Sequence, residues 1–256
     1  MDKKEKRKLA RKRFIPNFLT VLNMFLGFVS IGLIMEGQVV LAGIFILIAG
    51  ILDVSDGKIA RMLGISSRFG VEFDSMADTV SFCIVPSVLV YKLYVAGLPP
   101  ILGAMYSFLP LMFGTIRLAK FNIDQDPDVA KHYTIGLATP IATITLFAYL
   151  FFNLEVNGDH GDPRTALVLV AILGFLMVSS VPFSKFPLLS FKSGTTNSFL
   201  LIAFILTVIS LGIWQGYVLL PLSLFYISWN LFRWMAVQRN HPVHEENFHE
   251  SNKNES

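Results

Sequence analysis

Long apolar stretches constrain the fold of this chain more than any other feature. Of its 256 residues, 54% are hydrophobic and 15% are charged. Eight mostly apolar stretches have their centres near positions 26, 47, 85, 108, 145, 173, 205 and 225. Because a helix of about 20 apolar residues crosses a bilayer, we predict an all-α, polytopic integral membrane protein with about eight transmembrane helices.

The basic residues indicate the orientation of such a protein. If the N-terminus is cytoplasmic, 19 of the 21 Lys and Arg residues lie on that side, and only Lys92 and Arg164 lie on the other. Membrane proteins retain positive charge on the cytoplasmic side, so we expect a protein of the plasma or inner membrane with both termini cytoplasmic. The basic segment 1–14 fits an orientation signal and an attraction to anionic headgroups equally well.

The remaining polar sequence indicates no soluble domain. Residues 238–256 are polar and poor in apolar side chains, so we expect a disordered cytoplasmic tail. The single cysteine, Cys83, excludes an intramolecular disulfide and a multi-cysteine metal site. We expect no nucleic acid partner.

Four carboxylates interrupt the second and third apolar stretches: Asp53, Asp56, Asp74 and Asp78. A charged side chain inside a bilayer costs roughly 2.5 to 3.5 kcal/mol, so four of them require a compensating partner. At 100° per residue, Asp53 and Asp56 share one face of a helix, and the other two share one stripe of the next helix. We therefore expect the four to converge at one cytoplasmic, water-accessible mouth.

The chemistry of this cluster indicates a hard metal ion. No His or Cys lies on these faces, and carboxylate oxygens favour Mg²⁺, Mn²⁺ or Ca²⁺. Four carboxylates suit two ions about 3.5 to 4 Å apart, as in phosphoryl transfer. An alternative is that Lys58, Arg61 and Arg68 pair with the acids in interfacial salt bridges.

The spacing around the carboxylates resembles a known signature. Residues 53–78 follow the pattern D-x-x-D-G-x-x-A-R, eight residues, G-x-x-x-D-x-x-x-D, which is similar to that of the CDP-alcohol phosphotransferase family. The resemblance implies a six-helix transmembrane core over residues 15–190, two additional helices over 191–237, and a homodimer. It also implies two metal ions held by the four aspartates, with Asp78 as general base. It implies CDP binding by Asp53, Asp56, Gly57, Ala60, Arg61, Gly70 and Asp74.

Other segments resemble the phosphatidylserine synthase branch of that family. They are Pro16-Asn17 with Thr20 and Asn23, then 117–122, 136–140 and 181–187. This resemblance implies transfer of a phosphatidyl group from CDP-diacylglycerol to L-serine, with release of CMP.

The acceptor site needs a cation, because serine carries a carboxylate. Arg117 and Lys120, one turn apart, are the predicted residues, although the positive-inside rule also explains them. Asn23 and Lys185 are further predicted contacts of the acceptor or of a lipid phosphate. Polar groups on the first span, Asn23 among them, are equally explained by hydrogen bonds to another helix.

Three other functions remain open from the sequence. The same chemistry could use glycerol 3-phosphate, inositol phosphate or choline as acceptor. An aspartate-rich membrane prenyltransferase would also bind a diphosphate through Mg²⁺. A cation transporter would use the acids as an ion path and would show no dependence on CDP-diacylglycerol.

Overall fold

The fold is almost entirely helical, as predicted. The computed structural model describes residues 3–64, 67–124, 133–184 and 218–240. The elements are α1 (Lys3–Met35), α2 (Val39–Met62), α3 (Arg68–Asp78), the π-helix η1 (Thr79–Ile84), α4 (Val85–Leu93), α5 (Pro100–Asp124), β1 (Tyr133–Ile135), α6 (Thr139–Val156), α7 (Pro163–Val178), β2 (Pro182–Ser184) and α9 (Leu219–Asn240).

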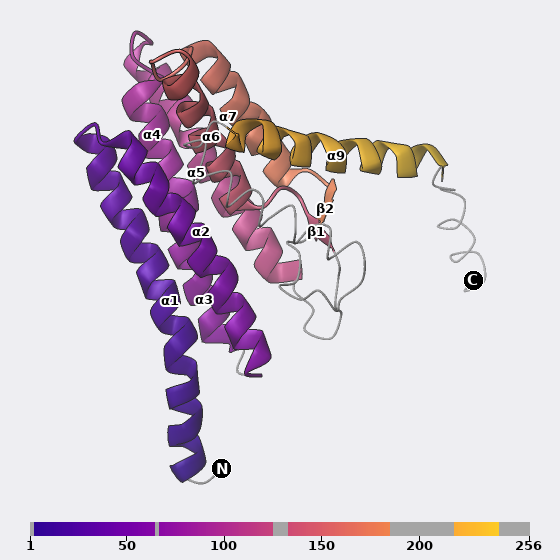
Figure 1. Ribbon diagram of the computed structural model, residues 1–256. Coiled ribbons are helices and arrows are strands. Elements are labelled where there is room, and N and C mark those ends of the chain that lie inside the picture. The colour runs from indigo at the N-terminus through magenta and orange to yellow at the C-terminus, as the bar shows by residue number, and fades with distance from the viewer. Residues whose placement is uncertain (1–2, 65–66, 125–132, 185–217, 241–256) are drawn as a thin grey trace.

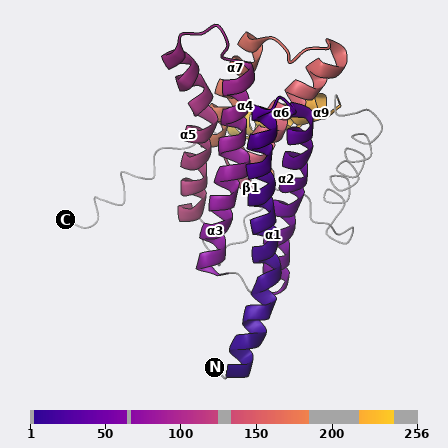
Figure 2. The ribbon, with the colours of Figure 1, turned by 90° about the vertical axis from the view of Figure 1, so that its left-hand side faces the viewer.

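Helices α1 to α7 form an up-and-down bundle (Figures 1 and 2). In the described residues, five helical segments are long and apolar enough to cross a membrane: Pro16–Met35, Val39–Ala60, Arg68–Leu93, Pro100–Ile123 and Thr139–Val156. Helix α7 is apolar but shorter, with 16 residues. The chain is therefore a polytopic membrane protein, and the third span consists of α3, η1 and α4 in succession.

The predicted number of eight transmembrane helices is not confirmed. The stretch centred near residue 205 lies outside the described residues. Helix α9, which we predicted as a further spanning helix, runs across the bundle rather than along it (Figure 1) and is not among the five spanning segments. Helix α9 also extends to Asn240, so it includes the first residues of the predicted tail.

The core of the bundle lies where α1, α2, α4 and α6 meet. Ile34, Ile46, Leu89 and Phe147 come from these four helices and are fully buried. Gly43 allows α2 to approach α6, since a Cβ there would lie 2.3 Å from the Phe151 ring. In lipid such close packing, rather than water exclusion, holds helices together.

A small sheet joins the chain before α6 to the chain after α7. Strands β1 and β2 pair antiparallel, with Thr134 opposite Phe183. Gly136 follows β1 with a φ of 77° and approaches the Met177 carbonyl so closely that a Cβ would lie 2.3 Å from its oxygen. Only glycine fits both constraints, and this turn sets where α6 begins, at Thr139.

Candidate metal centre

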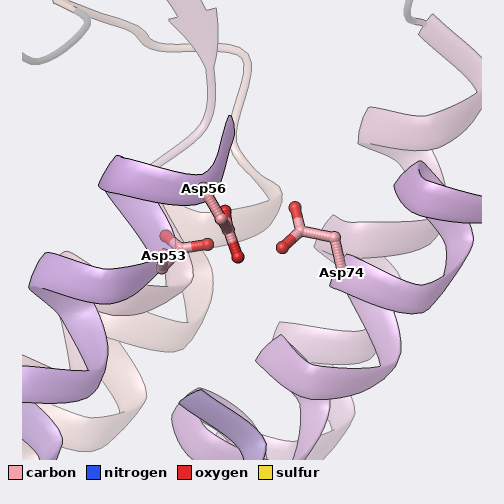
Figure 3. A group of neighbouring side chains, drawn as sticks. All are labelled: Asp53, Asp56 and Asp74. Carbon is pink, nitrogen blue, oxygen red and sulfur yellow. The ribbon is translucent and has the colours of Figure 1, made fainter. Parts of the chain in front are cut away.

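Three of the predicted carboxylates converge between α2 and α3. Asp53 and Asp56 come from α2 and Asp74 comes from α3, and Figure 3 shows the side chains facing one shared space. One oxygen from each carboxylate lies within 4.8 Å of the others. The structure therefore brings together three of the four carboxylates that the helical spacing placed at one site.

Ser67 fixes the start of α3, the helix that carries Asp74. Helix α2 ends at Met62, and α3 begins at Arg68 after Ser67 as N-cap. The Gly70 N–H donates to Ser67 Oγ at 3.1 Å, which satisfies one of the free N–H groups of the first turn. Asp74 follows one turn after Gly70, directly opposite the acids of α2.

Asp78 lies one turn beyond Asp74 on the same stripe of α3. Its side chain is 7% exposed and lies close enough to the Asp53 carboxylate for the two to interact electrostatically. One of its oxygens, Oδ1, is buried and has no hydrogen-bond partner among the described residues. Asp78 is not among the three carboxylates whose oxygens lie within 4.8 Å of one another, and its role as a metal ligand stays a prediction.

Helix α1 forms a third wall of the site. The Thr20 hydroxyl donates to Asp56 Oδ2 at 2.7 Å, which confirms for Thr20 the prediction that polar groups on this span bond to another helix. Asn23, one turn further along, is fully buried. Its backbone carbonyl accepts a hydrogen bond from Ser81, but in the part of the chain that the structure describes neither the oxygen nor the nitrogen of its side-chain amide has a partner.

The two predicted cations on α5 differ in burial. Arg117 is 8% exposed, donates to Thr139 Oγ1 at 3.5 Å and stacks 5.0 Å above the Phe121 ring. It interacts electrostatically with the carboxylates of Asp78 and Asp53, and its Nε has no hydrogen-bond partner within the described ranges. Lys120 is exposed. Only Arg117 thus lies beside the carboxylates.

Two further predicted nucleotide positions, Gly57 and Ala60, lie on α2 after Asp56. Gly57 follows Asp56, and a Cβ there would meet nothing within 4 Å, so the space beside it is open to a ligand. Ala60 is partly exposed one turn later. The side chain of Arg61 and all of Lys185 lie outside the described residues.

One contact beside the carboxylates, between α3 and α5, was not predicted. Ser75, between the two carboxylates of α3, donates to Asn122 Oδ1 at 3.1 Å and accepts from its Nδ2 at 2.9 Å. Asn122 also donates to Glu72 at 3.4 Å. These bonds tie α5 to α3 beside Asp74. Asn122 ends segment 117–122, which resembles the phosphatidylserine synthase branch. No helical spacing in the sequence connects it to Ser75.

The donor set fits a divalent cation. Three converging carboxylates from two helices offer only oxygen atoms, which suits hard ions. A buried, unpartnered carboxylate oxygen of Asp78 is costly without a ligand, and a cation beside it would remove that cost.

Comparisons with known proteins show the family of this chain. The profile described as CDP-alcohol phosphatidyltransferase matches residues 13–229. The chain is 33% identical over 224 residues to the CDP-diacylglycerol–serine O-phosphatidyltransferase of Helicobacter pylori, covering 86% of this chain and 90% of the relative. A Bacillus subtilis protein of the same name is 32% identical, with 68% and 91% covered. The archaetidylserine synthase of Methanothermobacter thermautotrophicus is 29% identical, with 67% and 70% covered. The chain belongs to the CDP-alcohol phosphatidyltransferase family.

Proposed function

We propose that this protein transfers the phosphatidyl group of CDP-diacylglycerol to L-serine, forming phosphatidylserine and CMP. The observation that carries the proposal is a cluster of carboxylates with a buried arginine beside it. Relatives that cover most of the chain have names that specify serine as the acceptor.

The carboxylates would hold the divalent ions. Asp53, Asp56 and Asp74, with Asp78 beside them, are the proposed ligands of two Mg²⁺ or Mn²⁺ ions, with Ca²⁺ as a further ion that the same oxygens suit. Bound ions supply charge neutralisation on the diphosphate oxygens. The open space beside Gly57 would receive the nucleotide, and Ala60, Arg61 and Gly70 would line the same side.

Asp78 is the proposed general base. Its carboxylate would take the proton of the serine hydroxyl while that hydroxyl oxygen attacks the phosphorus on the lipid side. The bond from this phosphorus to the bridging oxygen breaks, and the electron pair leaves with CMP.

Arg117 is the proposed ligand of the serine carboxylate. Its guanidinium is held by Thr139 and Phe121, and the free Nε leaves a donor for a bidentate pair. Asn23 is a second proposed contact, because its buried amide has no other partner. Lys120 and Lys185 would act further out, on lipid phosphate.

The surroundings of the site follow from this reaction. The diacylglycerol tails would remain in the bilayer while the headgroup enters from the cytoplasm. The distribution of Lys and Arg supports this orientation in the plasma or inner membrane. Family membership supports a homodimer.

A substrate panel tests the proposal. Purified protein is given CDP-diacylglycerol, Mn²⁺ or Mg²⁺, and labelled serine, glycerol 3-phosphate, inositol phosphate or choline, and both CMP and product lipid are measured. We expect serine-dependent CMP release that a chelator abolishes. Product with another acceptor alone would overturn the serine assignment, and metal flux without CMP release would indicate a transporter.

A further inference from the structure

The span that carries Asp74 and Asp78 is not a regular α-helix. Residues Thr79–Ile84 form the π-helix η1, which begins directly after Asp78. The Val85 N–H accordingly donates to the carbonyl of Val80, five residues back. Such widened turns are rare and are found mostly at functional sites. Three successive residues of η1, from Ser81 to Cys83, are buried, so this turn is enclosed by its neighbours.

Pro86 explains why the helix widens here. Proline has no N–H, and its ring clashes with the carbonyl four residues earlier in an α-helix, which is that of Phe82. Phe82 is 2% exposed, so its carbonyl would lack a partner. Thr143 of α6 supplies the missing donor, with Oγ1 to the Phe82 oxygen at 2.7 Å. Neighbouring Thr side chains commonly satisfy carbonyls that proline frees in membrane helices.

Two other helices hold η1 from the remaining sides. Ser81 Oγ donates to the Asn23 carbonyl of α1 at 3.0 Å. A Cβ on Gly27 of α1 would lie 2.4 Å from Ser81 Oγ, and a Cβ on Gly114 of α5 would lie 2.5 Å from Cys83 Sγ. Both helices therefore touch η1 at glycines, and η1 has little freedom to turn.

We propose that Thr143 is a positioning residue for Asp78, acting through the Phe82 carbonyl and η1. An α-helix advances 100° per residue, so removing the widened turn would rotate Asp78 relative to α4. Leu89 and Val90 hold α4 in the core. The rotation would therefore move the Asp78 carboxylate rather than α4. The proposal rests on the proposed role of Asp78 as general base.

Thr143→Val tests this proposal because it removes the hydroxyl and keeps the shape. We expect kcat to fall about tenfold, the effect of one hydrogen bond, while KM for CDP-diacylglycerol and for the acceptor stays within about twofold. Thr143→Ser, which keeps the donor, should restore kcat. Thr145→Val is the matched control, because Thr145 is buried on the same helix but bonds to Ile141 of its own helix at 2.8 Å, and its kcat should match wild type.

Pro86→Ala separates positioning from stability. Alanine returns an N–H to the Phe82 carbonyl and favours a regular helix, so we expect the melting temperature to stay level or rise while kcat falls. Wild-type kcat in Thr143→Val, an equal loss in Thr145→Val, or full kcat in Pro86→Ala would each overturn the inference. All variants are assayed with the acceptor that the wild type uses. If the serine assignment is wrong, the wild type itself fails to use serine, and this result is distinct from a wrong role for Thr143.

Discussion

The two ends of the bundle differ in whether the buried polar atoms described there have hydrogen-bond partners. At the end formed by the α4–α5 and α6–α7 turns, Tyr94 donates to the His160 carbonyl at 2.9 Å and Tyr149 to the Asp162 carbonyl at 3.0 Å. We call this the closed end. At the carboxylate end, in the described part of the chain, atoms of Asn23, Asp78 and Arg117 are buried without partners.

The difference separates polar groups that stabilise the fold from polar groups that we propose to be ligand contacts. An unsatisfied buried donor or acceptor costs about 1 to 3 kcal/mol. The carboxylate end therefore gives up stability that bound ions and substrate would restore, and the closed end supplies a rigid base. Changes at the carboxylate end should alter binding or turnover, whereas changes at the closed end should alter stability alone.

The largest effect is expected for Asp78→Asn. The amide has nearly the shape of the carboxylate but cannot accept the serine proton, so kcat should fall about 10²- to 10⁴-fold. CMP release measures kcat, and thermal unfolding in the same detergent should give a melting temperature no lower than that of wild type. Retained turnover would remove Asp78 as base.

The second largest effect is expected on the KM for serine when Arg117 is replaced. Arg117→Leu removes the buried cation beside Asp78 and Asp53, and we expect KM for serine to rise at least about 30-fold, as for a lost partner of a buried charge pair. KM for CDP-diacylglycerol should change little. Lys120→Ala is the control, since Lys120 is exposed on the same helix. An equal rise in serine KM for both variants would contradict the assignment.

A smaller effect is expected for Thr20→Val, which removes the 2.7 Å hydrogen bond to Asp56. Loss of a bond that orients a metal ligand typically weakens metal affinity about 10-fold or more. Equilibrium binding of Mn²⁺ measures it. Ser30→Ala is a matched change on the same helix, because Ser30 is buried and its hydroxyl bonds to the backbone carbonyls of Leu26 and Ala42, away from the carboxylates. Equal affinity in Thr20→Val and wild type would show that the bond does not orient the site.

At the closed end, Tyr149→Phe should affect stability alone. It removes the hydroxyl that bonds to the Asp162 carbonyl, so the free energy of unfolding should fall by about 1 kcal/mol. Chemical denaturation checks this value, and kcat should equal that of wild type. A loss of turnover would show that the two ends are coupled.

The smallest effect is a pH dependence at Asp162, the exposed N-cap of α7. The N–H of Thr165 holds the pKa of Asp162 below its ordinary value of 3.8. Because this pKa is lowered on folding, the stabilisation is present above pH 3.8 and is lost as the pH falls through the lowered value. Asp162→Asn should therefore melt slightly below wild type at neutral pH, and a difference that persists at about pH 2 would contradict this.

Much of the fold and site followed from length and periodicity. The lengths of the apolar stretches predicted the positions of the five spanning segments. Helical spacing predicted that Asp53, Asp56 and Asp74 lie close together. Periodicity did not predict η1, because this turn depends on Pro86 and on a donor from a distant helix. Nor did it separate Arg117 from Lys120, since both lie within one turn and packing decides which one is buried. The crosswise direction of α9 likewise depends on its contacts with α6 and β2.

Binding of Mn²⁺ to the metal-free protein tests most directly whether aspartates of α2 and α3 hold shared ions. Titration followed by electron paramagnetic resonance should give two tightly bound ions per chain in wild type. Asp56→Asn should lose this binding together with metal-dependent CMP release. Wild-type protein that binds no Mn²⁺ saturably, or Asp56→Asn protein that binds it as wild type does, would contradict the account.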